Sequence, residues 1–200
     1  MTDNKTSKAM AYEAARQQLL EQGYKETKAI ISIVKANILA LITTLPFVVL
    51  CCVLYFPKAF GDEFIIVFDV FSSFGFIITL IASIIVHEFL HGFTWRFFCK
   101  NSWKSIKFGV QWKIITPYCH CREALSFGAY LLGGLMPFIV LGAGIFVLAY
   151  IYESMFLFLL SMFGIIGAGG DITIALMLLK YRKAYIFDHP NECGFIAFTK

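Results

Sequence analysis

Residues 81–98 read IASIIVHEFLHGFTWRFF, and this stretch decides how the rest of the chain is interpreted. At its centre His87, Glu88 and His91 have the H-E-x-x-H spacing of zinc peptidases. Side chains four residues apart lie on the same face of a helix, so the two imidazoles can bind one Zn²⁺. Glu88 is then placed to act as the base of a metalloprotease. Residues 81–86 are apolar apart from one serine, so this helix lacks the polar face expected of a soluble enzyme.

The composition is that of an integral membrane protein. Hydrophobic residues make up 59% of the 200 positions, charged residues only 15%, and the mean hydropathy is +0.75. So little polar surface cannot cover a soluble core. The net charge of +4 comes from basic residues spread between apolar runs, without the clustering that binding to phosphates requires, which argues against a nucleic-acid partner.

The apolar runs predict an all-α membrane protein with about four transmembrane helices. The segment 64–98 is 35 residues long, and a straight helix of that length, about 52 Å, would exceed a hydrocarbon core of about 30 Å. We therefore expect a break near 72–75, with Asp69 in the outer piece. A proline at position 57 should end the first span. The predicted spans are 30–56, 76–98, 124–150 and 155–179.

The loop between the second and third spans contains a strand pattern. Ile106, Phe108 and Val110 alternate with Lys107, Gly109 and Gln111, and the pattern continues to residue 114. We expect a short cytoplasmic strand or β-hairpin here. Its edge could pair with an extended substrate, which makes the three apolar residues candidates for substrate binding. The alternative is a surface hairpin without a role in binding.

The polar segments give the domain division and the orientation. Residues 1–28 are a polar N-terminal segment with a short amphipathic helix at 11–20, residues 29–180 are the membrane domain, and residues 181–200 are a polar tail. The 96–123 loop carries six Lys or Arg and the 180–200 tail four, whereas the connections at 57–63 and 151–154 carry one between them. The positive-inside rule therefore places the long loop and both termini in the cytoplasm, in a cell membrane.

Asp171 is the best candidate for a third zinc ligand. A catalytic zinc usually takes three protein ligands, and Asp171 is the only ionisable residue between Glu153 and Lys180. It lies nine residues before Lys180, a depth similar to that of the two histidines. An intramembrane carboxylate could instead pair with Lys35 or line a polar cavity.

Other polar residues leave alternatives open. His120, within Cys119-His120-Cys121, is either a metal ligand or a loop residue. His189, followed by a proline, either supports the site or belongs to a turn. The His87–His91 pair itself could be a coincidental pair of core histidines, which would leave the buried Glu88 unexplained.

These residues also carry a resemblance to known families. HEFLHG at 87–92 together with GGD at 169–171 resembles the site-2 protease class of intramembrane metalloproteases. YLLGGLMPFIVLG at 130–142 and DHPNECG at 188–194 are similar to segments of the DUF3267 family of membrane zincins, a likeness that covers most of 65–195. Site-2 proteases carry Asn and Pro ahead of an Asp-Gly pair, whereas here the aspartate follows two glycines. The resemblance implies that His87, His91 and Asp171 bind a zinc ion and that Glu88 is the catalytic base.

The sequence thus predicts a zinc-dependent intramembrane metalloprotease that cleaves a membrane-associated protein or peptide near the cytoplasmic face. Its partners would be the lipid bilayer and that substrate. Two other classes are a metal-binding membrane scaffold without proteolytic activity and a small transporter. The lack of paired polar residues across several spans argues against the transporter.

Overall fold

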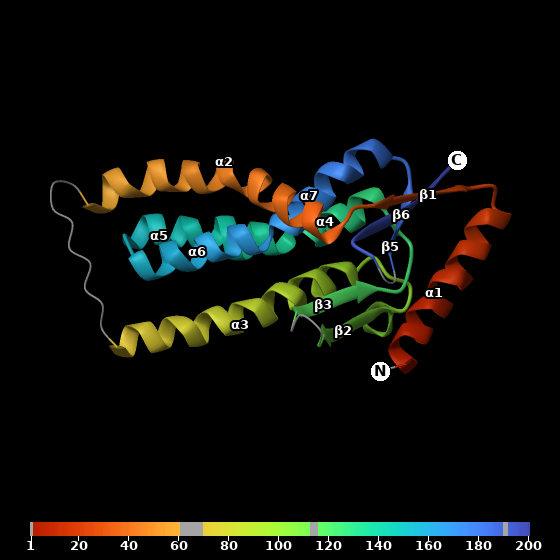
Figure 1. Ribbon diagram of the computed structural model, residues 1–200, viewed down its shortest axis with the longest axis horizontal. Coiled ribbons are helices and arrows are strands. Elements are labelled where there is room, and N and C mark those ends of the chain that lie inside the picture. Colours follow the sequence, from red (N-terminus) through yellow and green to blue (C-terminus); the bar gives the residue numbers. More distant parts are fainter. Residues whose placement is uncertain (1, 61–69, 113–115, 190–191) are drawn as a thin grey trace.

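The computed structural model describes residues 2–60, 70–112, 116–189 and 192–200, and most of them are helical (Figure 1). The helices are α1 (Thr2–Glu21), α2 (Ile33–Phe60), α3 (Val70–Trp95), α4 (Phe127–Pro137), the π-helix η2 (Phe138–Gly144), α5 (Ile145–Tyr152), α6 (Met155–Gly167) and α7 (Gly169–Leu178). Two short 3₁₀ helices are η1 (Ser102–Ser105) and η3 (Leu179–Tyr181). The strands are β1 (Lys25–Ile30), β2 (Ile106–Gln111), β3 (Thr116–Cys121), β4 (Leu125–Ser126), β5 (Tyr185–Asp188) and β6 (Gly194–Thr199).

The apolar helices form one elongated bundle. Within the described residues, three helices are long and apolar enough to cross a membrane, and a bent pair makes a fourth candidate. They are Ile33–Ala59, Phe74–Trp95, Phe127–Tyr152 and the pair Met155–Gly167 with Gly169–Tyr181. These segments lie within a few residues of the four predicted spans. The third combines α4, η2 and α5 into one continuous helical run.

The breaks in these helices are not where the sequence placed them. The predicted break at 72–75 is wrong, because α3 runs from Val70 through Trp95 without interruption. Asp69 lies outside the described residues. The first span also continues past Pro57 to Phe60. Serine and glycine lower helix propensity by about 1 kcal/mol at most, which does not interrupt a helix by itself.

The fourth span, predicted as one helix, bends by 43° between α6 and α7. Glycines surround the bend, and two of them allow close contacts between backbones. A Cβ on Gly164 would lie 2.4 Å from the Leu141 carbonyl oxygen, and one on Gly169 would lie 2.9 Å from the Ala40 carbonyl oxygen. The bend therefore lets α6 pack on η2 while α7 packs on α2.

The sheets lie at one end of the bundle (Figure 1). Residues 106–111 of the alternating pattern form β2, which pairs with β3 in an antiparallel hairpin, whereas residues 113 and 114 of the pattern lie outside the described residues. A second, four-stranded antiparallel sheet has the order β1-β6-β5-β4. This sheet is not predicted from the sequence, and the prediction of a polar tail at 181–200 is wrong where β5 and β6 form. The class is therefore mostly helical with a small antiparallel sheet, and the domain division stays a prediction.

The four-stranded sheet is a layer between α1 and the helical bundle. On one face, Phe187, Ile196 and Phe198 pack with Leu19 of α1. On the other face, Ile186 and Phe195 join a core with residues of α3, α4 and α7. This alternation is the period of two expected of strands buried on both faces. Because β1 pairs with β6, the two ends of the chain lie at the same end of the bundle.

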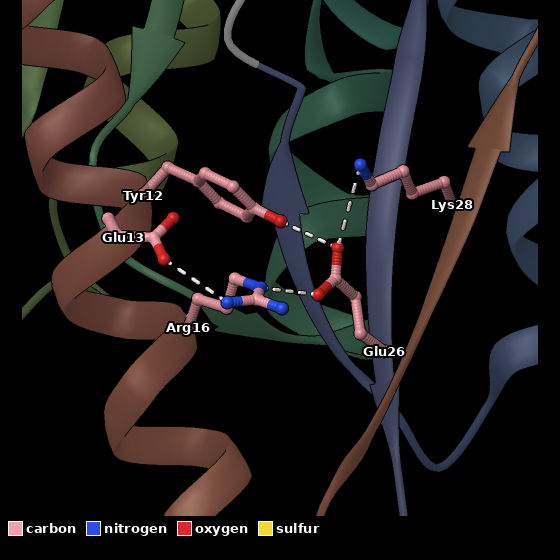
Figure 2. Close-up of polar contacts among 5 residues, drawn as sticks. All are labelled: Tyr12, Glu13, Arg16, Glu26 and Lys28. Carbon is pink, nitrogen blue, oxygen red and sulfur yellow. Dashed lines mark hydrogen bonds and ion pairs between the residues drawn. The ribbon is translucent and has the colours of Figure 1, made fainter.

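Polar contacts fix α1 to the edge of this sheet (Figure 2). The Tyr12 hydroxyl donates to Glu26 Oε1 at 2.6 Å, and Arg16 Nε donates to Glu26 Oε2 at 2.6 Å. Burial alone would raise the pKa of Glu26, but these two hydrogen bonds outweigh it and the pKa lies below its usual value. The helix predicted at 11–20 is thus part of a longer helix that packs on the sheet.

Candidate metal centre

Three potential ligand atoms converge between α3 and α7. His87 Nε2 lies 3.3 Å from His91 Nε2 and 3.2 Å from Asp171 Oδ2, and His91 Nε2 lies 3.4 Å from Asp171 Oδ1. Within the described part of the chain, this is the one group of three or more His, Cys, Asp or Glu side chains arranged to hold a metal. The structure thus brings Asp171 beside the two histidines, as expected from their depth, while its role as a zinc ligand stays a prediction.

The hydrogen bond of His91 directs its other ring nitrogen toward this group. His91 Nδ1 lies 2.8 Å from the Gly133 carbonyl oxygen, which can only accept, so Nδ1 carries the proton. In the neutral ring, Nε2 then presents its lone pair to His87 and Asp171. Metal-binding histidines are commonly fixed in this way by a carbonyl or carboxylate behind the ring.

Packing against Trp95 holds the His91 ring. The indole stacks on the imidazole with centroids 5.3 Å apart and an interplanar angle of 16°, and its Nε1 donates to the Tyr130 carbonyl oxygen at 3.1 Å. Gly133 makes this packing possible, because a Cβ there would lie 2.2 Å from the indole ring. Gly133, the first glycine of YLLGG, thus allows α4 to lie close to α3.

Asp188 connects the four-stranded sheet to the same region. It accepts hydrogen bonds from the Tyr130 hydroxyl and, at 2.8 Å, from the Cys121 backbone N–H. His120 Nδ1 lies 3.4 Å from the same carboxylate, so His120 belongs to this contact and not to the group around Asp171. His189 Nδ1 accepts from the Glu192 N–H at 2.9 Å, which is the turn anticipated for that histidine.

Glu88 lies half-buried beside the ligand group. The backbone N–H of Cys119 in β3 donates a hydrogen bond to its carboxylate. Gly92 lets the hairpin approach α3 here, since a Cβ on it would lie 2.5 Å from the Phe108 ring and 2.7 Å from the Ile106 side chain. Ile106 is buried, whereas Phe108 and Val110 are 41% and 37% exposed. Gly92 directly follows the H-E-x-x-H motif, but its role depends on the hairpin packed against it and is not predicted from the sequence.

The DUF3267 family, described as "Putative zincin peptidase", matches residues 80–186, more than half of the chain. The protein belongs to this family. The match spans both histidines, Glu88 and Asp171, and the family description is that of a zinc metallopeptidase in general. No curated protein and no solved structure matches the chain. The likeness to site-2 proteases stays a prediction from the motifs.

The residues present fit the zinc that the DUF3267 description implies. Zinc in proteins accepts imidazole nitrogens and carboxylate oxygens at about 2.0–2.2 Å, so ligand atoms around a tetrahedral ion are about 3.4 Å apart. The two imidazole nitrogens are 3.3 Å apart, and the nearest Asp171 oxygens lie 3.2 Å from His87 (Oδ2) and 3.4 Å from His91 (Oδ1). The two imidazoles and the carboxylate of this group can each offer a lone pair, and a divalent cation would satisfy them together.

Proposed function

We propose that this DUF3267 protein is a zinc-dependent intramembrane metalloprotease that cleaves a membrane-associated protein or peptide near the cytoplasmic face. The observation that carries the proposal is the convergence of His87, His91 and Asp171 within apolar helices that are long enough to cross a membrane. The experiment that tests it compares cleavage by the wild-type protein with cleavage by a Glu88→Gln variant.

The proposed chemistry divides between the metal and Glu88. Zinc bound by the three ligands would polarise the scissile carbonyl and make water a better nucleophile at neutral pH. Glu88 takes the proton of the attacking water and then donates it to the leaving amine. The hydrogen bond from Cys119 holds its carboxylate beside the ligand group. The hydrogen bond to Gly133 and the stacking of Trp95 keep the His91 ring oriented while charge develops on the substrate during hydrolysis.

The position of the ligand group supports cleavage close to one face. His91 and His87 lie four and eight residues before Trp95, where the apolar span ends, so they are about 6 and 12 Å from that end. The hairpin and the four-stranded sheet lie at the same end (Figure 1). In the most apolar 18-residue stretch of Phe74–Trp95, only 6% is buried within the protein, which fits a helix that contacts lipid.

The free edge of β2 is suited to hold an extended substrate segment. Directly opposite residues of an antiparallel pair exchange either both backbone hydrogen bonds or neither. The N–H groups of Cys119 and Cys121 bond to Glu88 and Asp188, so these residues do not bond to their partners Phe108 and Ile106. The backbone groups of Ile106, Phe108 and Val110 therefore point away from β3, toward the free edge.

This geometry refines the role proposed for these three residues. A strand added to β2 would lie about 4.8 Å farther from Glu88 than β2 does, with β3 between β2 and the carboxylate. The edge would thus hold a segment that flanks the scissile bond, bound through the backbone. The side chains of Phe108 and Val110 remain exposed to contact it.

Substitution of Val110 by proline should separate this role from the fold of the hairpin. Proline removes an N–H that points to the free edge and leaves the bonds between β2 and β3 intact. One backbone hydrogen bond contributes about 1 kcal/mol, so we expect cleavage to fall about fivefold while zinc content stays unchanged. Val110→Ala keeps the N–H and removes only side-chain contacts, so it should cleave faster than the proline variant. Equal cleavage by the proline variant would make the hairpin a surface element only.

Pairing of β1 with β6 supports the proposed topology, because both chain ends then lie on one side of a membrane. The six basic residues of the 96–123 loop favour the cytoplasm for that side. In a cysteine-accessibility experiment, Lys104→Cys should be labelled only by a reagent that enters the cytoplasm, and a cysteine at position 58 should be labelled from outside. Labelling of Lys104→Cys from outside would contradict the orientation.

A further inference from the structure

An arginine enclosed by aromatic rings lies at the end of α3. Arg96 is the first residue after the apolar span, and its Cζ lies 4.5 Å from the Phe93 ring centroid, 4.4 Å from that of Phe97 and 4.6 Å from that of Trp103. Phe89 stacks on Trp103 at 5.9 Å, so the cluster continues along the helix. Such cation–π contacts fix the guanidinium without neutralising its charge.

The charge of Arg96 is not balanced by the described protein. Among the described residues its guanidinium makes no ion pair, and its buried Nε has no hydrogen-bond partner. The segment 96–123 carries six Lys or Arg and one acid, Glu123. Glu123 instead accepts from the backbone N–H groups of Lys100 and Asn101, at 2.8 and 3.1 Å, and from the Ser105 hydroxyl. The loop is therefore a cationic region, and its one acidic side chain is already engaged in these hydrogen bonds.

The aromatic cluster continues the lipid-facing stripe of α3. Ile78, Ile81, Ile85, Phe89 and Phe93 are spaced three or four residues apart, and their side chains are 38–65% exposed. Arg96 follows Phe93 by three residues and so lies near the same stripe. The histidines are on another face, since Phe89 and Phe93 each follow a histidine by two residues, or about 200° around the helix. An anion at Arg96 would thus come from the surrounding bilayer and not from the metal centre.

We propose that Arg96 and its aromatic cluster bind the phosphate of an anionic phospholipid in the cytoplasmic leaflet. The guanidinium is at the height where an apolar span ends. Trp103, 39% exposed, supplies the amphipathic ring typical of that level, and Phe97, 64% exposed, adds apolar surface. Arginine suits phosphate because its planar N–H groups can donate in pairs. The inference rests on the membrane embedding in the proposed function and not on the proteolytic step.

The lipid also has a structural consequence at the site. Trp103 contacts Phe108 of β2 at 6.5 Å between centroids, and Phe108 in turn lies against Gly92. A headgroup held by Arg96 would therefore brace the hairpin against α3, next to the edge proposed to bind substrate. Lipid composition would then affect the protease through the position of the hairpin.

The test is retention of lipid by purified protein. Protein reconstituted in phosphatidylcholine with a minor share of phosphatidylglycerol is returned to detergent, and native mass spectrometry counts the lipids that stay bound. One cationic side chain near a membrane surface changes binding of anionic lipid about fivefold, so Arg96→Gln should retain about fivefold less phosphatidylglycerol than wild type. Arg182→Gln removes an exposed arginine that directly follows the fourth candidate span but lies outside the aromatic cluster, so it measures the general effect of one charge and should retain more phosphatidylglycerol than Arg96→Gln. Equal losses in both variants, or none in Arg96→Gln, would overturn the proposal.

Two further measurements test whether the site selects lipid over free phosphate and whether it requires the guanidinium. Inorganic phosphate at millimolar concentration should leave the bound lipid in place. Displacement of the lipid by phosphate would show a general anion site instead. Should Arg96→Gln fail to fold, Arg96→Lys keeps the charge but loses the paired donors, and it should also retain less phosphatidylglycerol; unchanged retention would reject the role of the guanidinium. Zinc content and cleavage are measured in parallel. In the wild-type protein, cleavage without preferential retention of phosphatidylglycerol rejects this inference alone, and preferential retention without cleavage rejects the proteolytic function alone.

Discussion

A Glu88→Gln protein is expected to bind one zinc as wild type does and to cleave no substrate. Glutamine keeps the size of the side chain and can still accept a hydrogen bond from the Cys119 N–H. It cannot take a proton from water at neutral pH. Removal of a general base typically costs 10²–10⁴-fold in rate, so turnover should fall by about that factor or below detection.

The measurements are zinc per protein, thermal stability and cleavage of a membrane-anchored substrate. Glu153→Gln is the matched control, since Glu153 lies in the turn before α6, makes an exposed ion pair with Lys58 at 3.6 Å, and should lose neither zinc nor activity. Because Glu88→Gln stops turnover and leaves the site assembled, it should also trap substrate for recovery from membranes. A Glu88→Gln protein that fully complements a deletion strain would instead favour the metal-binding scaffold.

The group of three potential ligands was predictable from the sequence because each of its residues stands out in an apolar context. His87 and His91 have the spacing of one helix face, and Asp171 is the single ionisable residue of its span. Counting residues from the ends of the two helices places the carboxylate and the histidines at a similar depth, and in the structure the three side chains lie together. The spans were recognisable for the same reason, since hydropathy depends on composition and not on tertiary contacts.

The remaining parts depend on contacts between distant segments. The four-stranded sheet joins residues 25–30 to 194–199, and no local pattern in such short strands predicts that pairing. Asp188 connects to Tyr130 across 58 positions, so its hydrogen bonds could not be inferred from the turn in which it lies. The bend before Asp171 likewise depends on the packing of Gly164 on Leu141 and of Gly169 on Ala40.

Loss of zinc in ligand variants is the second large effect, and it distinguishes Asp171 from His120 as the third ligand. His87→Ala and His91→Ala should each abolish stoichiometric zinc. Asp171→Ala should weaken zinc binding by more than about 100-fold, the upper end of the cost of changing an outer partner of a ligand. His120 lies 3.4 Å from Asp188 and outside the ligand group, so His120→Ala should keep its zinc even if the hairpin is less stable. The measurement is metal analysis of purified, folded protein with a zinc-chelator titration. Full zinc in Asp171→Ala together with loss in His120→Ala would reverse the assignment and would place the metal at the sheet.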